Sequence, residues 1–144
     1  MKTGVLAVAA WLLIPCSSVA EQLGNFDCVA FSDFEQASVK TDVMKVGSFN
    51  VYEKLSGTDK QSAGLLLSYT AVNETRGLVY LAGDFLLVDG AGAPLAAINA
   101  TPVKLFVEAG KSMVVNGHTI VSAGTLAAAR KVCIRIHLSL PPRD

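Results

Sequence analysis

The feature that most constrains the fold is a series of short apolar runs, each soon ended by Gly, Asn, Asp or Pro. No stretch repeats its apolar residues at the 3.6-residue spacing of a long helix. Strand-length runs separated by turn residues are typical of antiparallel β-proteins. The sequence therefore predicts an all-β fold, an antiparallel β-sandwich of about seven strands, with an up-and-down barrel as the alternative.

The apolar runs define the expected strands. They cover residues 28–31, 43–55, 65–72, 78–88, 95–98, 103–107, 112–121 and 132–140. The long run 43–55 changes face near Gly47, which suggests a β-bulge. Asn116-Gly117 is the best signal for a type I′ turn, so we expect it to break the run 112–121. Single helical turns are expected within 33–39 and 125–130.

The first twenty residues have the pattern of a cleavable signal peptide. Lys2 precedes an apolar run over 5–14, and small residues lead to Ala20, so cleavage would leave Glu21 first. Residues 21–144 then form a single domain in the periplasm or outside the cell. As an alternative, Leu13-Ile14-Pro15-Cys16 resembles a lipoprotein site, at which Cys16 would carry a lipid anchor.

Charge and hydropathy exclude two classes of partner. The full chain has 12 basic and 12 acidic side chains, scattered without a run of one sign. A neutral surface of this kind has no electrostatic attraction for nucleic acid or an anionic membrane. After the signal peptide, no apolar stretch approaches the length of a membrane span.

Removal of the signal peptide leaves two cysteines, Cys28 and Cys133, one near each end of the domain. In an oxidising compartment such a pair is expected to form a disulfide, with two buried thiols as the alternative. Val132 and Ile134 share the apolar face of the last strand, whereas Cys133 lies on the other face. The disulfide should therefore join the first strand to the last on the outer surface and not through the core.

No catalytic or cofactor motif is complete. Gly110-Lys111-Ser112 is similar to the end of a phosphate-binding loop, but Leu105 stands where that loop needs its first glycine. The paired carboxylates are Asp33 with Glu35 and Asp84 with Asp89, but the sequence gives no sign of the burial that acid–base chemistry needs, so we expect solvated surface charges. The sequence thus predicts a protein that is not an enzyme and has no catalytic residues and no cofactor.

His118 and His137 are the only histidines, and no other ligand stands near either at metal-site spacing. A metal site would need the fold to bring them to each other or to a carboxylate, so none is predicted. Triplets that begin at Asn73 and Asn99 match the N-glycosylation pattern. The short alanine-rich signal is typical of bacteria, so we expect both asparagines to be unmodified.

Residues 71–122 carry an ordered series of turns. A polar turn at Asn73 is followed by a strand, an aspartate–glycine turn at Asp89, a glycine before a polar residue at Gly110, and another strand. This order resembles the small bacterial envelope domains named for a Phe-x-Leu-Tyr-Asp (FxLYD) signature and their immunoglobulin-like relatives. Phe85, Leu87 and Asp89 match the signature, and Val88 replaces its tyrosine. The resemblance implies that the antiparallel β-sandwich is immunoglobulin-like, and that the domain is a binding or accessory module without catalytic residues.

Apolar residues occupy both faces of 78–81 and 132–140, so either the fold covers both faces or a sheet edge or face meets a partner. Exposed sheet edges commonly bind extended segments. The sequence therefore predicts an exported, non-enzymatic protein that acts through protein–protein binding in the cell envelope, as an accessory, chaperone-like or inhibitory factor. The alternative is a small-ligand or metal-binding carrier of the periplasm.

Overall fold

The computed structural model of the chain describes residues 21–23, 25–58 and 60–142, which form an antiparallel β-sandwich. The predicted signal peptide, with Cys16, lies outside the described residues. No helix in the described part of the chain is long and apolar enough to cross a membrane.

Within these residues the chain forms ten strands and two short helices. They are β1 (Glu21–Leu23), β2 (Phe26–Ala30), the 3-10 helix η1 (Phe31–Gln36), β3 (Ser38–Lys40), β4 (Met44–Leu55), β5 (Ser62–Asn73), β6 (Val79–Val88), β7 (Pro94–Ala100), β8 (Phe106–Val107), β9 (Ser112–Ser122), α1 (Thr125–Ala128) and β10 (Lys131–Ser139). The prediction of an all-β fold is confirmed. Two strands that the sequence did not predict, β1 and β3, are only three residues long.

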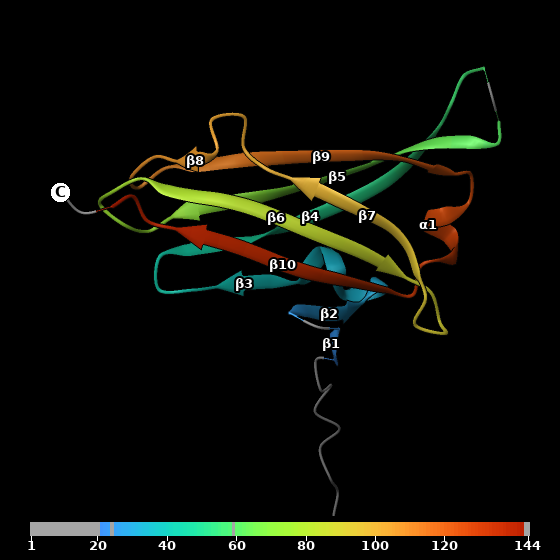
Figure 1. Cartoon of the computed structure of the whole chain (residues 1–144), viewed down its shortest axis with the longest axis horizontal. Coiled ribbons are helices and arrows are strands. Elements are labelled where there is room, and N and C mark those ends of the chain that lie inside the picture. Colours follow the sequence, from blue (N-terminus) through green and yellow to red (C-terminus); the bar gives the residue numbers. More distant parts are fainter. Residues whose placement is uncertain (1–20, 24, 59, 143–144) are drawn as a thin grey trace, which may run out of the picture.

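The strands form two stacked sheets, which overlap in the view of Figure 1, where β6 crosses over β4 and β5. Sheet A has the order β1-β2-β10-β6-β7, and β8 pairs with β6 outside this path. Sheet B has the order β3-β4-β5-β9. Every pairing is antiparallel, and β7 of sheet A lies against β9 of sheet B at one side of the sandwich.

The core lies between the sheets because the strands alternate in polarity. In β5 every second side chain is buried, and the intervening ones are half-buried on the outer face. The centre of the core is an aromatic cluster of Phe34, Phe49, Tyr69 and Phe85, with ring centroids 5.1 to 6.4 Å apart. These side chains come from η1 and both sheets, so the cluster joins the two layers.

Tyr69 also ties the two sheets together by a hydrogen bond. From β5 in sheet B its hydroxyl donates to the carbonyl of Ala100 in β7 of sheet A, at 2.8 Å. Gly83 makes room for this contact, since a Cβ at this position would lie 3.0 Å from the Tyr69 hydroxyl. Burial raises the pKa of Tyr69 far above its ordinary value, and the charge of Asp84 adds to this shift. Tyr69 is therefore a neutral donor at any physiological pH.

The predicted disulfide between Cys28 and Cys133 is confirmed. The two residues face each other directly in the β2–β10 ladder. Val132 and Ile134 belong to the main core, whereas the disulfide belongs to a separate cluster with Val88. The predicted face is correct, but the bond is not exposed. Cys133 is only 1% accessible, because apolar neighbours cover it on the outer face of sheet A.

Two smaller predictions about turns are also confirmed. The β4–β5 register shifts between Gly47 and Asn50, as expected for a bulge near Gly47. The Asp89 carboxylate caps its own turn by accepting hydrogen bonds from the backbone N–H groups of Ala91 and Ala93, both at 2.9 Å. Gly92 supplies the positive φ, at 87°, that this reversal needs.

Two expectations about strands are wrong. In the range 103–107 only Phe106 and Val107 form a strand, and Val103 is fully exposed. The chain turns here instead, with a positive φ at Leu105 and a 2.8 Å hydrogen bond from its N–H to the Pro102 carbonyl. The expected break at Asn116-Gly117 does not occur either, because β9 runs continuously from Ser112 to Ser122.

Candidate functional site

The candidate site is the open edge of β9, which hydrogen-bonds to a neighbouring strand only on its β5 side. Among the edge strands, β9 has 11 residues, whereas β1 and β3 have three each and β7 has seven. No Asp, Glu, Lys, Arg or Pro occurs between Ser112 and Ser122. Charged residues and prolines are the usual protection of an edge strand against further pairing. This edge therefore lacks the usual features that prevent addition of another strand.

The ladder shows which backbone groups are available at this edge. The N–H of Asn73 donates to the carbonyl of Lys111 at 2.9 Å, so this pair bonds across the ladder. Bonded and non-bonded pairs alternate in an antiparallel ladder. Met113 and Val115 therefore bond to β5, whereas the N–H and C=O groups of Val114 and Asn116 point to the open edge. In the described part of the chain, no loop or turn donates to or accepts from these groups.

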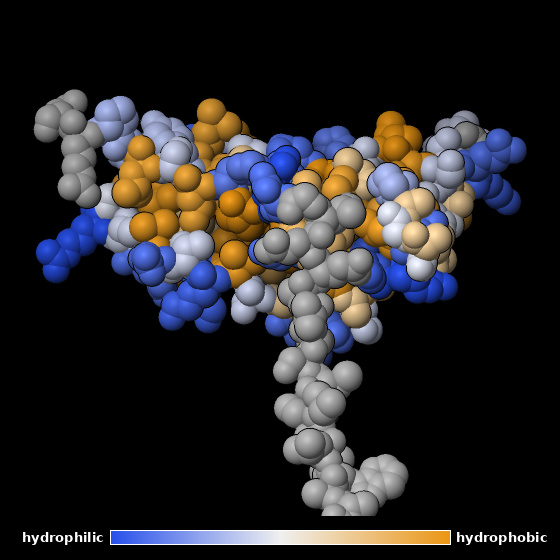
Figure 2. Space-filling view, turned by 60° about the horizontal axis from the view of Figure 1, so that its bottom comes forward, coloured by the Kyte–Doolittle hydropathy of each residue, from blue (hydrophilic) through white to orange (hydrophobic). Residues whose placement is uncertain are grey.

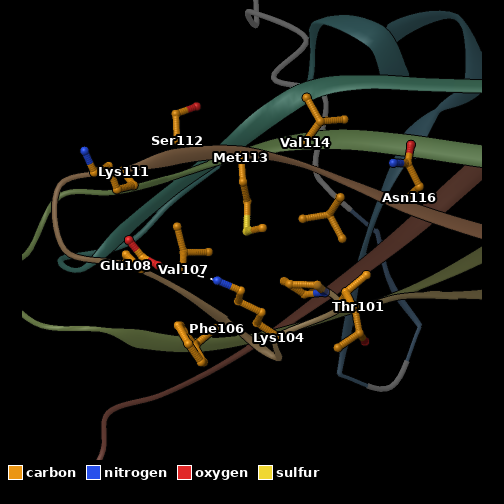
Figure 3. A pocket seen from close by; sticks show the side chains of 13 residues that line it. Thr101, Lys104, Phe106, Val107, Glu108, Lys111, Ser112, Met113, Val114 and Asn116 are labelled. Atoms are coloured by element: carbon orange, nitrogen blue, oxygen red, sulfur yellow. Dashed lines mark ion pairs between the residues drawn. The ribbon is translucent and has the colours of Figure 1, made fainter.

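A groove of about 520 Å³ lies along this edge, between β9 and the segment 101–108. We call it the β9 groove, lined by Pro102, Lys104, Phe106, Val107, Met113 and Val115 with their neighbours in both segments. Figure 3 shows Met113 pointing from β9 towards Val107 and Lys104, whereas Ser112 and Val114 point away. The lining is predominantly apolar.

The groove exists because the chain leaves sheet A after β7. Pro102 has no N–H to continue a ladder, and the turn that follows carries residues 103–105 outwards. The chain then returns, and Val107 pairs with Val79 of β6. This detour separates the 101–108 segment from β9 and leaves Met113 only partly covered.

The groove is closed at the Gly117 end. A Cβ on Gly117 would lie 2.5 Å from the carbonyl oxygen of Asn99 and 2.7 Å from the Cβ of Ala100. Only glycine lets β9 approach β7 so closely. The expected turn residue thus has a different role, since it brings the two sheet edges together and limits the open edge to residues 112–116.

Apolar side chains also reach the surface elsewhere. Figure 2 shows them in several groups, separated by hydrophilic side chains, on the side that faces down in Figure 1. Scattered exposed apolar residues are normal in soluble proteins. The β9 edge differs from such groups because unpaired backbone groups and an apolar groove occur together there.

The two histidines lie far from one another, on the outer faces of different sheets. His118 is on β9 of sheet B and His137 is on β10 of sheet A. His137 does meet a carboxylate, with its Nε2 2.9 Å from Oδ2 of Asp84. The guanidinium of Arg135 is also 2.9 Å from that oxygen. A fixed positive charge thus occupies the place next to Asp84 that a cation would need. The described residues contain no group of three or more His, Cys, Asp or Glu that could hold a metal ion.

Asp84 is the centre of a polar network that the sequence did not suggest. Besides Arg135 and His137, it accepts a 2.9 Å hydrogen bond from the side-chain amide of Asn99. Burial by itself would raise the pKa of Asp84. The hydrogen bonds from Asn99, Arg135 and His137, and the charge of Arg135, outweigh this and hold the pKa below its ordinary value. The residues of this network are far apart in the sequence. They meet because β6 pairs with β7 and β10, which the sequence alone does not show.

Asn73, the first glycosylation-like asparagine, is a buried structural residue. Its side-chain amide donates to the carbonyls of Gly77, Val107 and Glu108 at 2.7 to 3.1 Å. It thereby fastens the start of the β9 groove to the end of β5. Asn99 is exposed and donates to Asp84, so the two similar triplets have different surroundings.

Searches with protein-family models and against curated proteins find no match to this chain. The resemblance to FxLYD domains therefore stays a prediction. Within the described residues, the β9 edge and its groove are the features best suited to binding another molecule.

Proposed function

We propose that this chain is an exported, non-enzymatic protein that binds an extended segment of another protein along the open edge of β9. The observation that carries the proposal is the uncharged open edge of β9, residues 112–116, beside an apolar groove. A strand added to Val114 and Asn116 would complete their hydrogen bonds and place alternate side chains in the groove. An accessory, chaperone-like or inhibitory factor would act in this way.

The energetics require both parts of the site. Each added backbone hydrogen bond contributes only about 1 kcal/mol net. Association costs at least several kcal/mol in lost freedom, so backbone pairing alone gives weak binding. Burial of apolar side chains, at about 25 cal/mol per Å², must supply the rest. The groove provides that burial next to the backbone donors and acceptors.

Site-specific photo-cross-linking in the exporting cell tests this function. A photoreactive amino acid replaces Met113 in the groove or, as control, the exposed Asn50 on β4. We expect the residue 113 probe to give a discrete adduct with a partner protein, which mass spectrometry identifies. The control position should give none. Absence of a discrete adduct at residue 113 would contradict the proposal.

A second pair of variants tests the binding mode. Val114→Pro removes one outward N–H and leaves the ladder with β5 intact, whereas Val114→Ala keeps that N–H. We expect the adduct at residue 113 to be lost in Val114→Pro and kept in Val114→Ala. Equal adducts in both variants would show that the partner does not pair with the edge.

Export is the second part of the proposal. The Cys28–Cys133 disulfide fits an oxidising compartment. The intact mass of the protein from its own cell tests the signal peptide. We expect the mass of residues 21–144 less two hydrogens. A mass that includes Cys16 and a lipid would establish the anchored form instead, and retention of residues 1–20 would contradict cleavage.

The groove volume favours one alternative function. A volume of about 520 Å³ is within the usual range for small-ligand pockets. A small-ligand carrier would show a bound compound of constant mass in native mass spectrometry. Met113→Asp should abolish such binding, and a cross-linked partner protein at residue 113 would decide against this alternative.

A further inference from the structure

We infer that the segment bound at β9 runs antiparallel to it and carries an acidic side chain near its C-terminal end, opposite Lys111. This inference rests on the proposed function and adds the direction and charge of the partner segment. The charge follows from the side chains around the β9 groove and from which end of the groove is closed, and the direction follows from the preference for antiparallel pairing.

The charged groups around the groove leave one lysine without a partner. Lys104 and Glu108 form an ion pair, with Nζ and Oε1 3.9 Å apart. Lys111 is exposed and has no ion pair with any described residue. Figure 3 shows Lys111 at the end of the groove, with its amine pointing away from Glu108. The uncompensated charge at this end is therefore positive.

The neighbouring turn does not change this balance. The N–H of Gly110 donates to the carbonyl of Thr75 at 3.1 Å, so the 74–77 turn packs beside Lys111. That turn contains one acidic residue, Glu74, and one basic residue, Arg76, whose charges offset each other. The open end of the groove favours a carboxylate over an amine.

The geometry of the edge fixes where that carboxylate must lie. Residues 112–116 are open, and β7 covers the edge at Gly117. Five residues of strand span about 17 Å. We expect antiparallel pairing, because it is more stable per residue than parallel pairing and every strand pair of the two sheets has it. The C-terminal end of the partner segment then lies next to the N-terminal end of β9, where Lys111 precedes Ser112. Apolar side chains at alternate positions before it face Met113 and Val107.

Defined peptides test the inference on the exported chain. Acetylated and amidated peptides of about six residues alternate valine and threonine and end in glutamate, glutamine or lysine. NMR shifts locate the binding, and fluorescence polarisation gives the affinities. We expect chemical-shift changes at Ser112–Asn116. The glutamate peptide should bind more tightly than the glutamine peptide, and the glutamine peptide more tightly than the lysine peptide. For an exposed ion pair, each step should be about two- to threefold.

A charge exchange supplies the control. Lys111→Glu should reverse the order, so that the lysine peptide binds tightest. Lys54→Glu, at an exposed site on β4, makes the same charge change and should leave the order unchanged. Two results would overturn this inference and leave the proposed function standing, both with chemical-shift changes at Ser112–Asn116. In one, the three peptides bind with equal affinity; in the other, Lys111→Glu does not reverse the order of their affinities. Absence of shifts at these residues counts against both.

Discussion

At the scale of single residues, Asn73 connects three segments through one buried side chain, which is 1% accessible. Its amide donates to three carbonyls, and its oxygen accepts from the N–H and hydroxyl of Thr75. Asn73→Ala leaves these groups without partners, so we expect a loss of about 3 kcal/mol in the free energy of unfolding. Urea denaturation measures this loss. The exposed Asn50→Ala should change stability by less than about 0.5 kcal/mol, and a similar small effect for Asn73→Ala would contradict the account.

Asp84 determines part of the pH dependence. Its pKa is lower in the folded protein than in the unfolded chain. The carboxylate therefore stabilises the fold above its ordinary pKa of about 4, and this contribution is lost as pH falls through the lower folded pKa. We expect Asp84→Asn to be less stable than the native chain at pH 6, with a difference that shrinks below about pH 4. Thermal unfolding across this range measures it, and a difference independent of pH would show that the network is not electrostatic.

At the scale of elements, the contact of β9 with β7 depends on Gly117. Gly117→Ala places a Cβ against the Asn99 carbonyl, so one strand must move. We expect a loss of about 2 kcal/mol, as for overpacking in a core. Gly57→Ala is the matched control, because nothing lies within 4 Å of its Cβ and its φ is not positive. If the two variants had equal stability, the close approach of the strands would be refuted.

Most elements follow from local sequence patterns, but their neighbours do not. The alternation of β10 predicted which face carries Cys133, and the apolar runs predicted β4, β5 and β6. The run 103–107 also alternates, yet Pro102 and the turn at Leu105 prevent a full strand. Asn116-Gly117 has turn chemistry, but pairing of the whole of β9 with β5 overrides it.

The candidate site was only partly predictable for the same reason. The absence of charge between Ser112 and Ser122 is visible in the sequence. That β9 is an edge strand, and that the 101–108 segment lies beside it, depends on contacts between residues distant in the chain. The Asp84 network likewise requires the β6–β10 and β6–β7 registers, which no local pattern encodes.

At the scale of the whole molecule, one disulfide joins the beginning of the fold to its end. Cys28 and Cys133 are 105 residues apart in sequence and adjacent in sheet A. A closed loop of about this length stabilises by up to about 4 to 5 kcal/mol in the loop-entropy model, which usually overestimates. We expect the double variant Cys28→Ala/Cys133→Ala to lose about 3 kcal/mol in urea unfolding. A loss below about 1 kcal/mol would show that the sandwich does not depend on this covalent link.

The central claim is that the edge of β9 is open in the free protein and pairs with a partner. Residue-resolved amide hydrogen exchange tests this most directly. In the free chain, the amides of Val114 and Asn116 should exchange at least about tenfold faster than those of Met113 and Val115, which bond to β5. With the cross-linked partner bound, all four should be protected. Protection of Val114 and Asn116 in the free chain, or their continued fast exchange in the complex, would contradict the claim.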